Sequence, residues 1–184
     1  MFINIITAAA VLASGAITTT GGVAPVDSVR VQVSDRSIST IRLDPAHALL
    51  DVSVSDPSLV EVQVVSDGIV AVTGDPGPAG VHMLLRRSGR SPLDVHLVPS
   101  RGAVSSTVVD VDGASSASRP AVHRWNVSGS RVSQLSPGFP IRSALRTGAA
   151  QVAGLSDGAF VTSGAKGDVV AYGQHDEVAI YHMR

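Results

Sequence analysis

Apolar and polar residues alternate most clearly between residues 48 and 85. Residues 51–55 read Asp-Val-Ser-Val-Ser, and residues 60–64 read Val-Glu-Val-Gln-Val. A period of two places one side of a strand in a core and the other in water. The apolar runs are separated by Asp-Pro-Ser, Ser-Asp-Gly and a Gly/Pro loop, which are residues that turns require. This stretch therefore predicts three strands joined by turns.

The alternation continues on both sides of this stretch. Residues 29–33 and 38–43 predict two strands before it, and residues 93–98 predict one after the polar loop at 86–92. Together these segments make about seven strands before Ser100, at the spacing of a β-sandwich or small barrel. No segment has a sustained helical period, so the predicted fold class is all-β.

Three turn positions carry specific expectations. Asp56 followed by Pro57 predicts a capped, single helical turn that includes Ser58. Gly68 and Gly74 are each expected to take a positive φ angle, which a hairpin or bulge needs and glycine allows. We interpret all of these residues as serving the fold and not chemistry.

The second part of the chain repeats the first. Residues 59–77 read LVEVQVVSDGIVAVTGDPG, and residues 149–167, ninety positions on, read AAQVAGLSDGAFVTSGAKG. Matching turns fall between matching strands, which indicates a repeated structural unit. The matches are Val62 with Val152, the Ser-Asp-Gly turns at 66–68 and 156–158, and Gly74 and Gly77 with Gly164 and Gly167.

The second copy is degraded. It lacks the Asp-Pro pair, its glycine loop is shorter, and the strand predicted at 141–145 is weak. Two clear strands follow at 169–172 and 178–183. We expect this copy to be marginal alone and to rely on docking to the first.

These patterns predict four segments. Residues 1–24 are a signal peptide and leader, because the apolar run from Phe2 to Ala16 has the length of a signal-peptide core and is short for a bilayer span. No Lys or Arg precedes this run, and a disordered or strand-forming terminus is the alternative. Two β-sandwich domains follow, at 25–101 and 123–184, joined by a Ser/Ala/Gly/Asp-rich linker at 102–122. Within the linker, the apolar run at 108–111 predicts an added edge strand of the first domain.

Composition narrows the classes of function. Fourteen Lys and Arg residues nearly balance fifteen Asp and Glu residues, and Lys166 is the sole lysine. No basic cluster stands out, so nucleic acid is not an expected partner. The chain has no cysteine, which excludes disulfides, thiolate metal sites and a cysteine nucleophile. After removal of the leader, no integral membrane span is predicted.

Candidate chemistry is sparse. His82 and His96 lie on successive predicted strands and are positioned to face each other across a ladder, but no third ligand has suitable spacing for a metal. His175 begins a polar turn, and the Asp-Val-Asp-Gly run at 110–113 lacks the later ligands of a calcium loop. There is no G-x-S-x-G elbow, phosphate loop or dinucleotide fingerprint. We therefore predict no catalytic, cofactor-binding or metal residues, no cofactor, and no enzymatic activity; the other histidines are interpreted as structural or surface residues: His47, His123 and His182.

The first predicted domain resembles a known family. Its run of V-x-V-x-D-P, V-x-V and v-x-v-x-G segments is similar to the pilus-formation N-terminal domain of secretins and related proteins of Tad/Flp pilus assembly systems. His82 stands at the family's usual Thr, and the loop at 74–80 is longer. Bacterial Ig-like domains share this rhythm, so the resemblance implies two tandem Ig-like β-sandwich domains after the signal peptide. The matching residues are Val54, Asp56, Pro57, Val60, Val62, Val72, Gly74 and Gly80.

The resemblance also implies a function. We expect a non-enzymatic, periplasmic or exported accessory protein of a Tad/Flp-type pilus assembly or secretin apparatus. It is expected to contact envelope proteins, among them a secretin or pilus components, through an exposed edge strand. The alternative is an exported Ig-like adhesion or structural module that binds a surface ligand.

Overall fold

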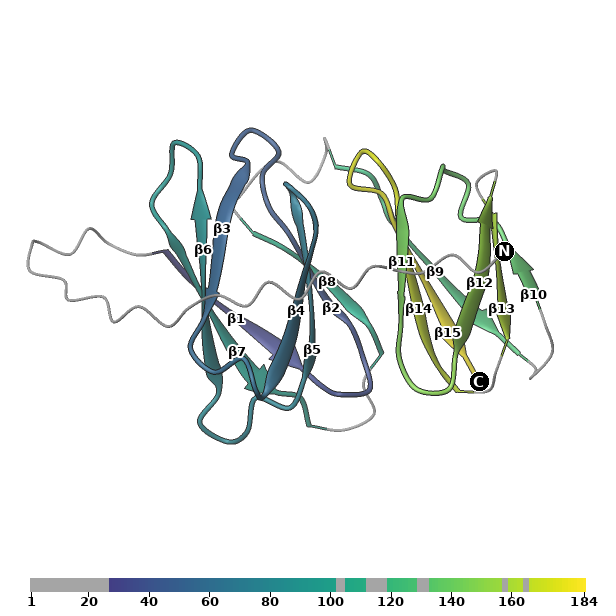
Figure 1. The fold of residues 1–184 in the computed structure, drawn as a ribbon, viewed down its shortest axis with the longest axis horizontal. Coiled ribbons are helices and arrows are strands. Elements are labelled where there is room, and N and C mark those ends of the chain that lie inside the picture. Colours follow the sequence, from purple (N-terminus) through teal and green to yellow (C-terminus); the bar gives the residue numbers. More distant parts are fainter. Residues whose placement is uncertain (1–26, 102–104, 112–118, 129–132, 157–158, 164–165) are drawn as a thin grey trace, which may run out of the picture.

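The computed structural model describes residues 27–101, 105–111, 119–128, 133–156, 159–163 and 166–184. The predicted signal peptide lies outside these residues. The described chain is entirely β, with fifteen strands in four sheets (Figure 1). Among these residues no helix is long and apolar enough to cross a membrane.

The first domain is a two-sheet sandwich. One sheet has the order β1-β7-β6-β3 and the other has the order β4-β5-β2-β8. β1 pairs with β7 in parallel, and β8 pairs with β2 in parallel, whereas the other neighbours are antiparallel. β2, β5 and β4 lie side by side in one sheet, and β3, β6 and β7 belong to the other. This is the strand arrangement of an immunoglobulin domain. The strands are β1 (Asp27–Val33), β2 (Ser39–Arg42), β3 (Leu49–Val54), β4 (Val60–Ser66), β5 (Ile69–Gly74), β6 (Val81–Arg87), β7 (Leu93–Pro99) and β8 (Thr107–Asp110).

The second domain has the same strand order. Its sheets are β11-β14-β15-β9 and β10-β13-β12, and its first strand again pairs in parallel with its last. The predicted fold class, two tandem Ig-like β-sandwich domains, is confirmed by this arrangement. The strands are β9 (Val122–Val127), β10 (Ser133–Leu135), β11 (Ser143–Arg146), β12 (Gln151–Ser156), β13 (Ala159–Ser163), β14 (Gly167–Tyr172) and β15 (Val178–Met183).

The register of the ladders repeats with the sequence. Val62 on β4 pairs with Val72 on β5, and ninety residues later Val152 on β12 pairs with Thr162 on β13. Both pairs of strands also carry an irregularity close to the turn that joins them. The sequence match between the two copies is therefore a match of ladder positions.

β8 breaks the symmetry between the copies. It lies inside the range predicted as linker and is an edge strand of the first domain, as its apolar run predicts; the strand it pairs with is β2. Among the described residues, no strand occupies the corresponding edge of β10 in the second domain.

Each sandwich has its own core, built mainly from aliphatic side chains. In the first domain Ile41, Met83 and Leu97 are fully buried between the sheets. In the second, Val169 and Met183 occupy the equivalent layer. The alternation that predicts the strands thus fills these two cores.

A third apolar layer joins the domains. The outer face of the β4-β5-β2-β8 sheet packs against the outer face of the β11-β14-β15-β9 sheet, so the four sheets form successive layers (Figure 1). Ile69 and Ala71 from the first domain meet Tyr172 and Ile180 from the second. The hydroxyls of Thr40 and Tyr172 share a hydrogen bond of 2.9 Å across the layer. The expected docking of the second copy is therefore present as a buried interface.

Ser106 ties the two domains together next to this layer. Its hydroxyl accepts a hydrogen bond from the Ile38 amide at 2.9 Å. Its own amide donates to Asp168 at 2.6 Å, and its carbonyl accepts from Arg124 at 2.8 Å. Asp168 and Arg124 belong to the second domain, so this one buried residue bonds to both domains.

A second polar cluster fixes β8 in place. Arg42 donates to both carboxylate oxygens of Asp110, at 2.7 and 3.0 Å, and to the Pro120 carbonyl at 2.8 Å. Arg119 donates to Asp110 at 2.8 Å. Burial raises the pKa of Asp110, but the hydrogen bonds and charges of the two arginines outweigh it and hold the pKa below its ordinary value.

Two turn predictions need correction. Gly74 has a φ of 132°, as expected, but Gly68 has no positive φ. A Cβ at Gly68 would lie 2.9 Å from the carboxylate of Asp176, so glycine lets this side chain of the second domain approach the turn closely. Asp56 caps its turn by accepting from the Ser58 amide at 3.0 Å, yet the segment forms a turn and not a helical turn.

Candidate protein-binding surface

The outer face of the β1-β7-β6-β3 sheet carries a cluster of polar side chains. We call it the histidine face and define it by Arg30, His82, Asp94 and His96. These positions alternate along β1, β6 and β7 with the buried residues of the first core. The core therefore fixes the backbone beneath them.

The two histidines of this face stack on each other. His82 and His96 are direct partners in the β6·β7 ladder, and their rings lie 4.5 Å apart and nearly parallel, at 5°. His82 Nδ1 lies 3.1 Å from both carboxylate oxygens of Asp94, which orients the ring. The predicted pairing across the ladder is confirmed. The arrangement offers a flat imidazole surface, a carboxylate and a neighbouring guanidinium for polar contacts.

The loop between β5 and β6 forms one side of this surface. Gly80 has a φ of 76°, and a Cβ there would lie 2.4 Å from His96 Nε2. Glycine therefore allows the loop to lie directly on the imidazole. At the tip, Asp75 accepts a hydrogen bond from the Gly77 amide at 3.0 Å, which fixes the turn.

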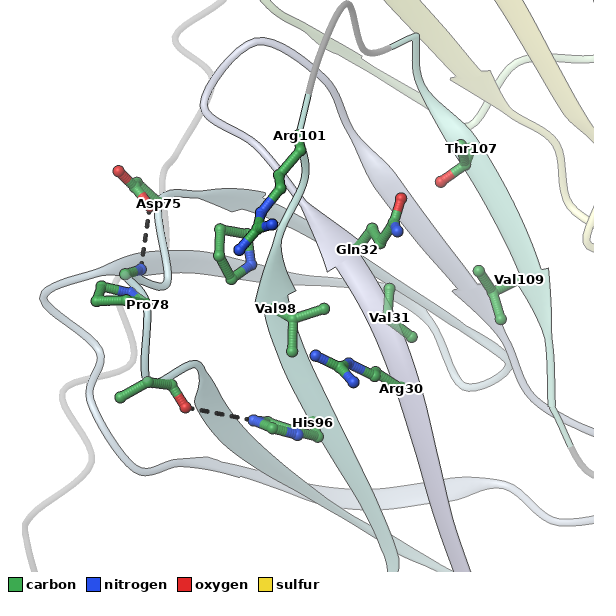
Figure 2. A pocket seen from close by; sticks show the side chains of 13 residues that line it. Arg30, Val31, Gln32, Asp75, Pro78, His96, Val98, Arg101, Thr107 and Val109 are labelled. Carbon is green, nitrogen blue, oxygen red and sulfur yellow. Dashed lines mark hydrogen bonds between the residues drawn. The ribbon is translucent and has the colours of Figure 1, made fainter.

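A cleft of about 1020 Å³ runs from the histidine face around the edge of β1 toward β8. Figure 2 shows the side chains that line it, with Arg30 and Arg101 on either side of Val98. Among the described residues neither arginine has an acidic partner, so both guanidinium groups are free to bind an anion. Val31 and Val109 give the cleft apolar walls.

The corresponding sheet face of the second domain is different in character. It carries Val170, Tyr172, Val178 and Ile180, all buried against the first domain. The histidine face lies at the same place in the fold, but it is polar and solvent-exposed, with 58% of the His82 side chain accessible. Of the two equivalent faces, one is therefore used inside the molecule and the other is open.

The remaining histidines lie apart from this face. The ring of His47 lies 3.0 Å from the Ser88 carbonyl, and His175 sits in the polar turn predicted for it, with 85% of its side chain exposed. His123 stacks on Trp125 at 5.5 Å. Among the described residues no three His, Asp or Glu side chains form a metal-binding group.

Ser106, Asp168 and His182 come together in a way that the sequence does not predict. The imidazole of His182 contacts one oxygen of Asp168, and the Ser106 amide bonds the other. A hydrolytic triad needs the serine hydroxyl on the imidazole, but here the carboxylate lies between them and the hydroxyl accepts from a backbone amide. This cluster joins the domains and lacks the geometry that activates a nucleophile.

Comparison with known proteins gives little to set beside this geometry. No family model matches the chain, and no curated protein matches it. Among solved structures, the chain is similar to the crystal structure of Dscam1 isoform 8.4, N-terminal four Ig domains, at 11% identity and a TM-score of 0.31. That match covers 85% of this chain and 49% of the other, so this chain spans about half of that structure.

Proposed function

We propose that the protein is a non-enzymatic binding module of the bacterial cell envelope and an accessory protein of a Tad/Flp-type pilus assembly or secretin apparatus. It acts by protein–protein contact, and the histidine face is its contact surface. The resemblance of the first domain to the pilus-formation N-terminal domain supports a role in this apparatus.

One observation supports the histidine face as the contact surface. Two equivalent sheet faces exist, and the one in the second domain is already covered by the first domain. The histidine face is the counterpart left open, and it is held by a core of buried aliphatic residues. A rigid sheet that displays polar groups loses little conformational entropy on binding, which favours specific contact.

Photo-cross-linking in the native envelope tests the proposal. A photoreactive residue replaces Leu84, which lies on the same outer face between the histidine pair and Arg86. The matched control replaces the exposed Gln151 on β12 of the second domain. We expect a secretin or another pilus component to be captured at Leu84 and not at Gln151. Equal capture at both positions, or capture at Leu84 of unrelated proteins alone, contradicts the proposal.

The alternative function, an exported Ig-like adhesion, is favoured by an aromatic pair on β9. Trp125 is 39% exposed, and its ring stacks with those of His123 on the same strand and Tyr181 on β15, with centroids 5.5 and 4.9 Å away. Exposed, preorganised rings of this kind suit contact with a ligand that has an apolar face. If Trp125→Ala abolishes adhesion to surfaces while pilus assembly is intact, the adhesion function is the better conclusion.

A further inference from the structure

Among the described residues, no strand pairs with the edge of β1 that faces away from β7, and this edge forms one wall of the cleft described above. We propose that this edge binds an extended segment of a partner protein in which acidic and apolar residues alternate, by adding it as a strand to the β1-β7-β6-β3 sheet. The inference rests on the proposed function in taking the partner to be a protein, and it specifies the chemistry of that partner.

The backbone of β1 supplies the first argument. In a parallel ladder, alternate residues direct their amide and carbonyl groups toward the neighbouring strand. The Val33 carbonyl accepts from the Ser100 amide at 2.9 Å, so Val33 faces the β7 side. Gln32 faces away, and its carbonyl is already taken by the Ser39 hydroxyl at 2.6 Å. Ser28 and Arg30 share the orientation of Gln32, and no described residue bonds their backbone groups.

Charge supplies the second argument. Arg30, on the outer face of β1, and Arg101, just after the end of β7, both line the cleft. Neither has an acidic partner among the described residues. Guanidinium groups bind carboxylates through paired hydrogen bonds. Asp75 also lines the cleft, and one of its carboxylate oxygens accepts from the Gly77 amide. The two guanidinium groups outnumber this one carboxylate, so the lining keeps a positive formal charge. A segment seated here is therefore expected to direct carboxylates toward the two arginines.

The walls of the cleft supply the third argument. The apolar lining on the inner side of the β1 edge is Val31, a buried member of the first core, and Val109, which is partly buried against that core. Successive side chains of a strand point to opposite faces. A segment added to β1 therefore directs one set of side chains toward the arginines and the other toward these valines. Acidic and apolar residues in alternation satisfy both sides.

Fluorescence anisotropy with the whole chain tests the proposal. The probe is a labelled eight-residue peptide that alternates glutamate and valine, with capped ends. We expect saturable binding, weakened by about threefold to thirtyfold in a protein that carries Arg30→Ala and Arg101→Ala, because two exposed charge pairs are lost. Arg86→Ala is the matched control, since Arg86 lies on the same outer face but does not line the cleft.

The order of residues in the peptide is tested separately from its charge. A peptide of the same composition, with four glutamates followed by four valines, is expected to bind at least about tenfold more weakly. Equal binding of the two peptides overturns the proposal, because a surface that attracts charge alone does not distinguish them.

Strand addition is tested at the backbone. Ser28→Pro removes an outward-facing amide and no ladder bond, so it is expected to weaken peptide binding while thermal unfolding stays near the wild-type value. A peptide that carries N-methyl groups on alternate backbone amides is likewise expected to bind the unaltered protein more weakly. Retained binding of the methylated peptide overturns strand addition. These assays use purified protein. A negative result in them therefore counts against strand addition alone and can be distinguished from a failure to capture pilus components in the envelope.

Discussion

At the scale of single residues, three contacts fix key positions of the structure: a stack of two histidines, the approach of a glycine to the second domain, and a bidentate arginine. The pairing of His82 with His96 follows from alternation in two adjacent strands, and it is confirmed. Gly68 does not take the positive φ that its local sequence predicts, and its close neighbour, Asp176, comes from the other domain. The bonds between Arg42 and Asp110 join residues 68 positions apart, and nothing local to either residue indicates them.

Gly80→Ala is the first prediction at this scale. The φ of 76° strains any side chain, and a Cβ would lie 2.4 Å from His96 Nε2 and 2.7 Å from the Leu97 carbonyl oxygen, which cannot rotate away. We expect a loss of about 2 to 4 kcal/mol in the free energy of unfolding, measured with urea. Gly77→Ala is the control, since its φ is 67° but nothing lies within 4 Å of the added Cβ. It is expected to cost about 1 kcal/mol. Equal costs for the two variants contradict the contact with His96.

Asp110 carries a prediction about pH. Its pKa is lowered from 3.8 in the folded protein, so its bonds stabilise the fold above that value and are lost as pH falls through the lower, folded value. We expect the stability difference between the wild type and Asp110→Asn to be largest near neutral pH and to shrink in acid. Urea unfolding at a series of pH values measures it. A difference that stays constant from pH 7 to pH 2 contradicts the assignment.

At the scale of elements, alternation and turn residues predict the strands, and the repeat predicts which strands correspond. The sequence does not tell where β8 attaches, because a short apolar run suits any free edge. Its attachment depends on Arg42, whose side chain is 4% exposed and binds Asp110 across the β2·β8 ladder. The partner of such a strand is set by a buried contact far away in the sequence.

Removing Arg42 is therefore expected to release β8. Arg42→Ala leaves Asp110 without its bidentate partner and the Pro120 carbonyl without a donor, at a cost of about 3 kcal/mol in the free energy of unfolding. Hydrogen exchange is expected to accelerate at the β8 amides more than in β6. The control, Arg90→Ala, removes an exposed arginine that bonds His47 in a loop. Unchanged exchange at β8 in the Arg42 variant is evidence against this role.

At the scale of the whole molecule, the sequence predicts two docked units but not the faces that meet. A signal is nevertheless present. Residues 69–72 read Ile-Val-Ala-Val and residues 169–172 read Val-Val-Ala-Tyr, and all of them are buried. An unbroken apolar run indicates a strand buried on both faces. These two strands belong to the sheets that pack together in the interface.

Tyr172 at the centre of this interface allows a test of how the molecule unfolds. It is fully buried, and its hydroxyl bonds Thr40 of the other domain at 2.9 Å. We expect the wild type to unfold in one calorimetric transition, because the second copy depends on the interface. Tyr172→Ala, which removes a large buried side chain at a cost of about 3 to 5 kcal/mol, is expected to separate a low-temperature transition of the second domain from that of the first.

A conservative variant separates packing from hydrogen bonding. Tyr172→Phe keeps the ring and removes the bond to Thr40, so we expect one transition at a temperature lowered by a few degrees, for a loss of about 1 kcal/mol. Burial raises the pKa of the Tyr172 phenol, so its contribution is complete below its ordinary value of 10 and is lost as pH rises toward the folded value. The wild type is therefore expected to approach the stability of the Phe variant in strong alkali. If Tyr172→Ala lowers a single transition without splitting it, the interface does not hold two separable units, and the four sheets unfold as one body.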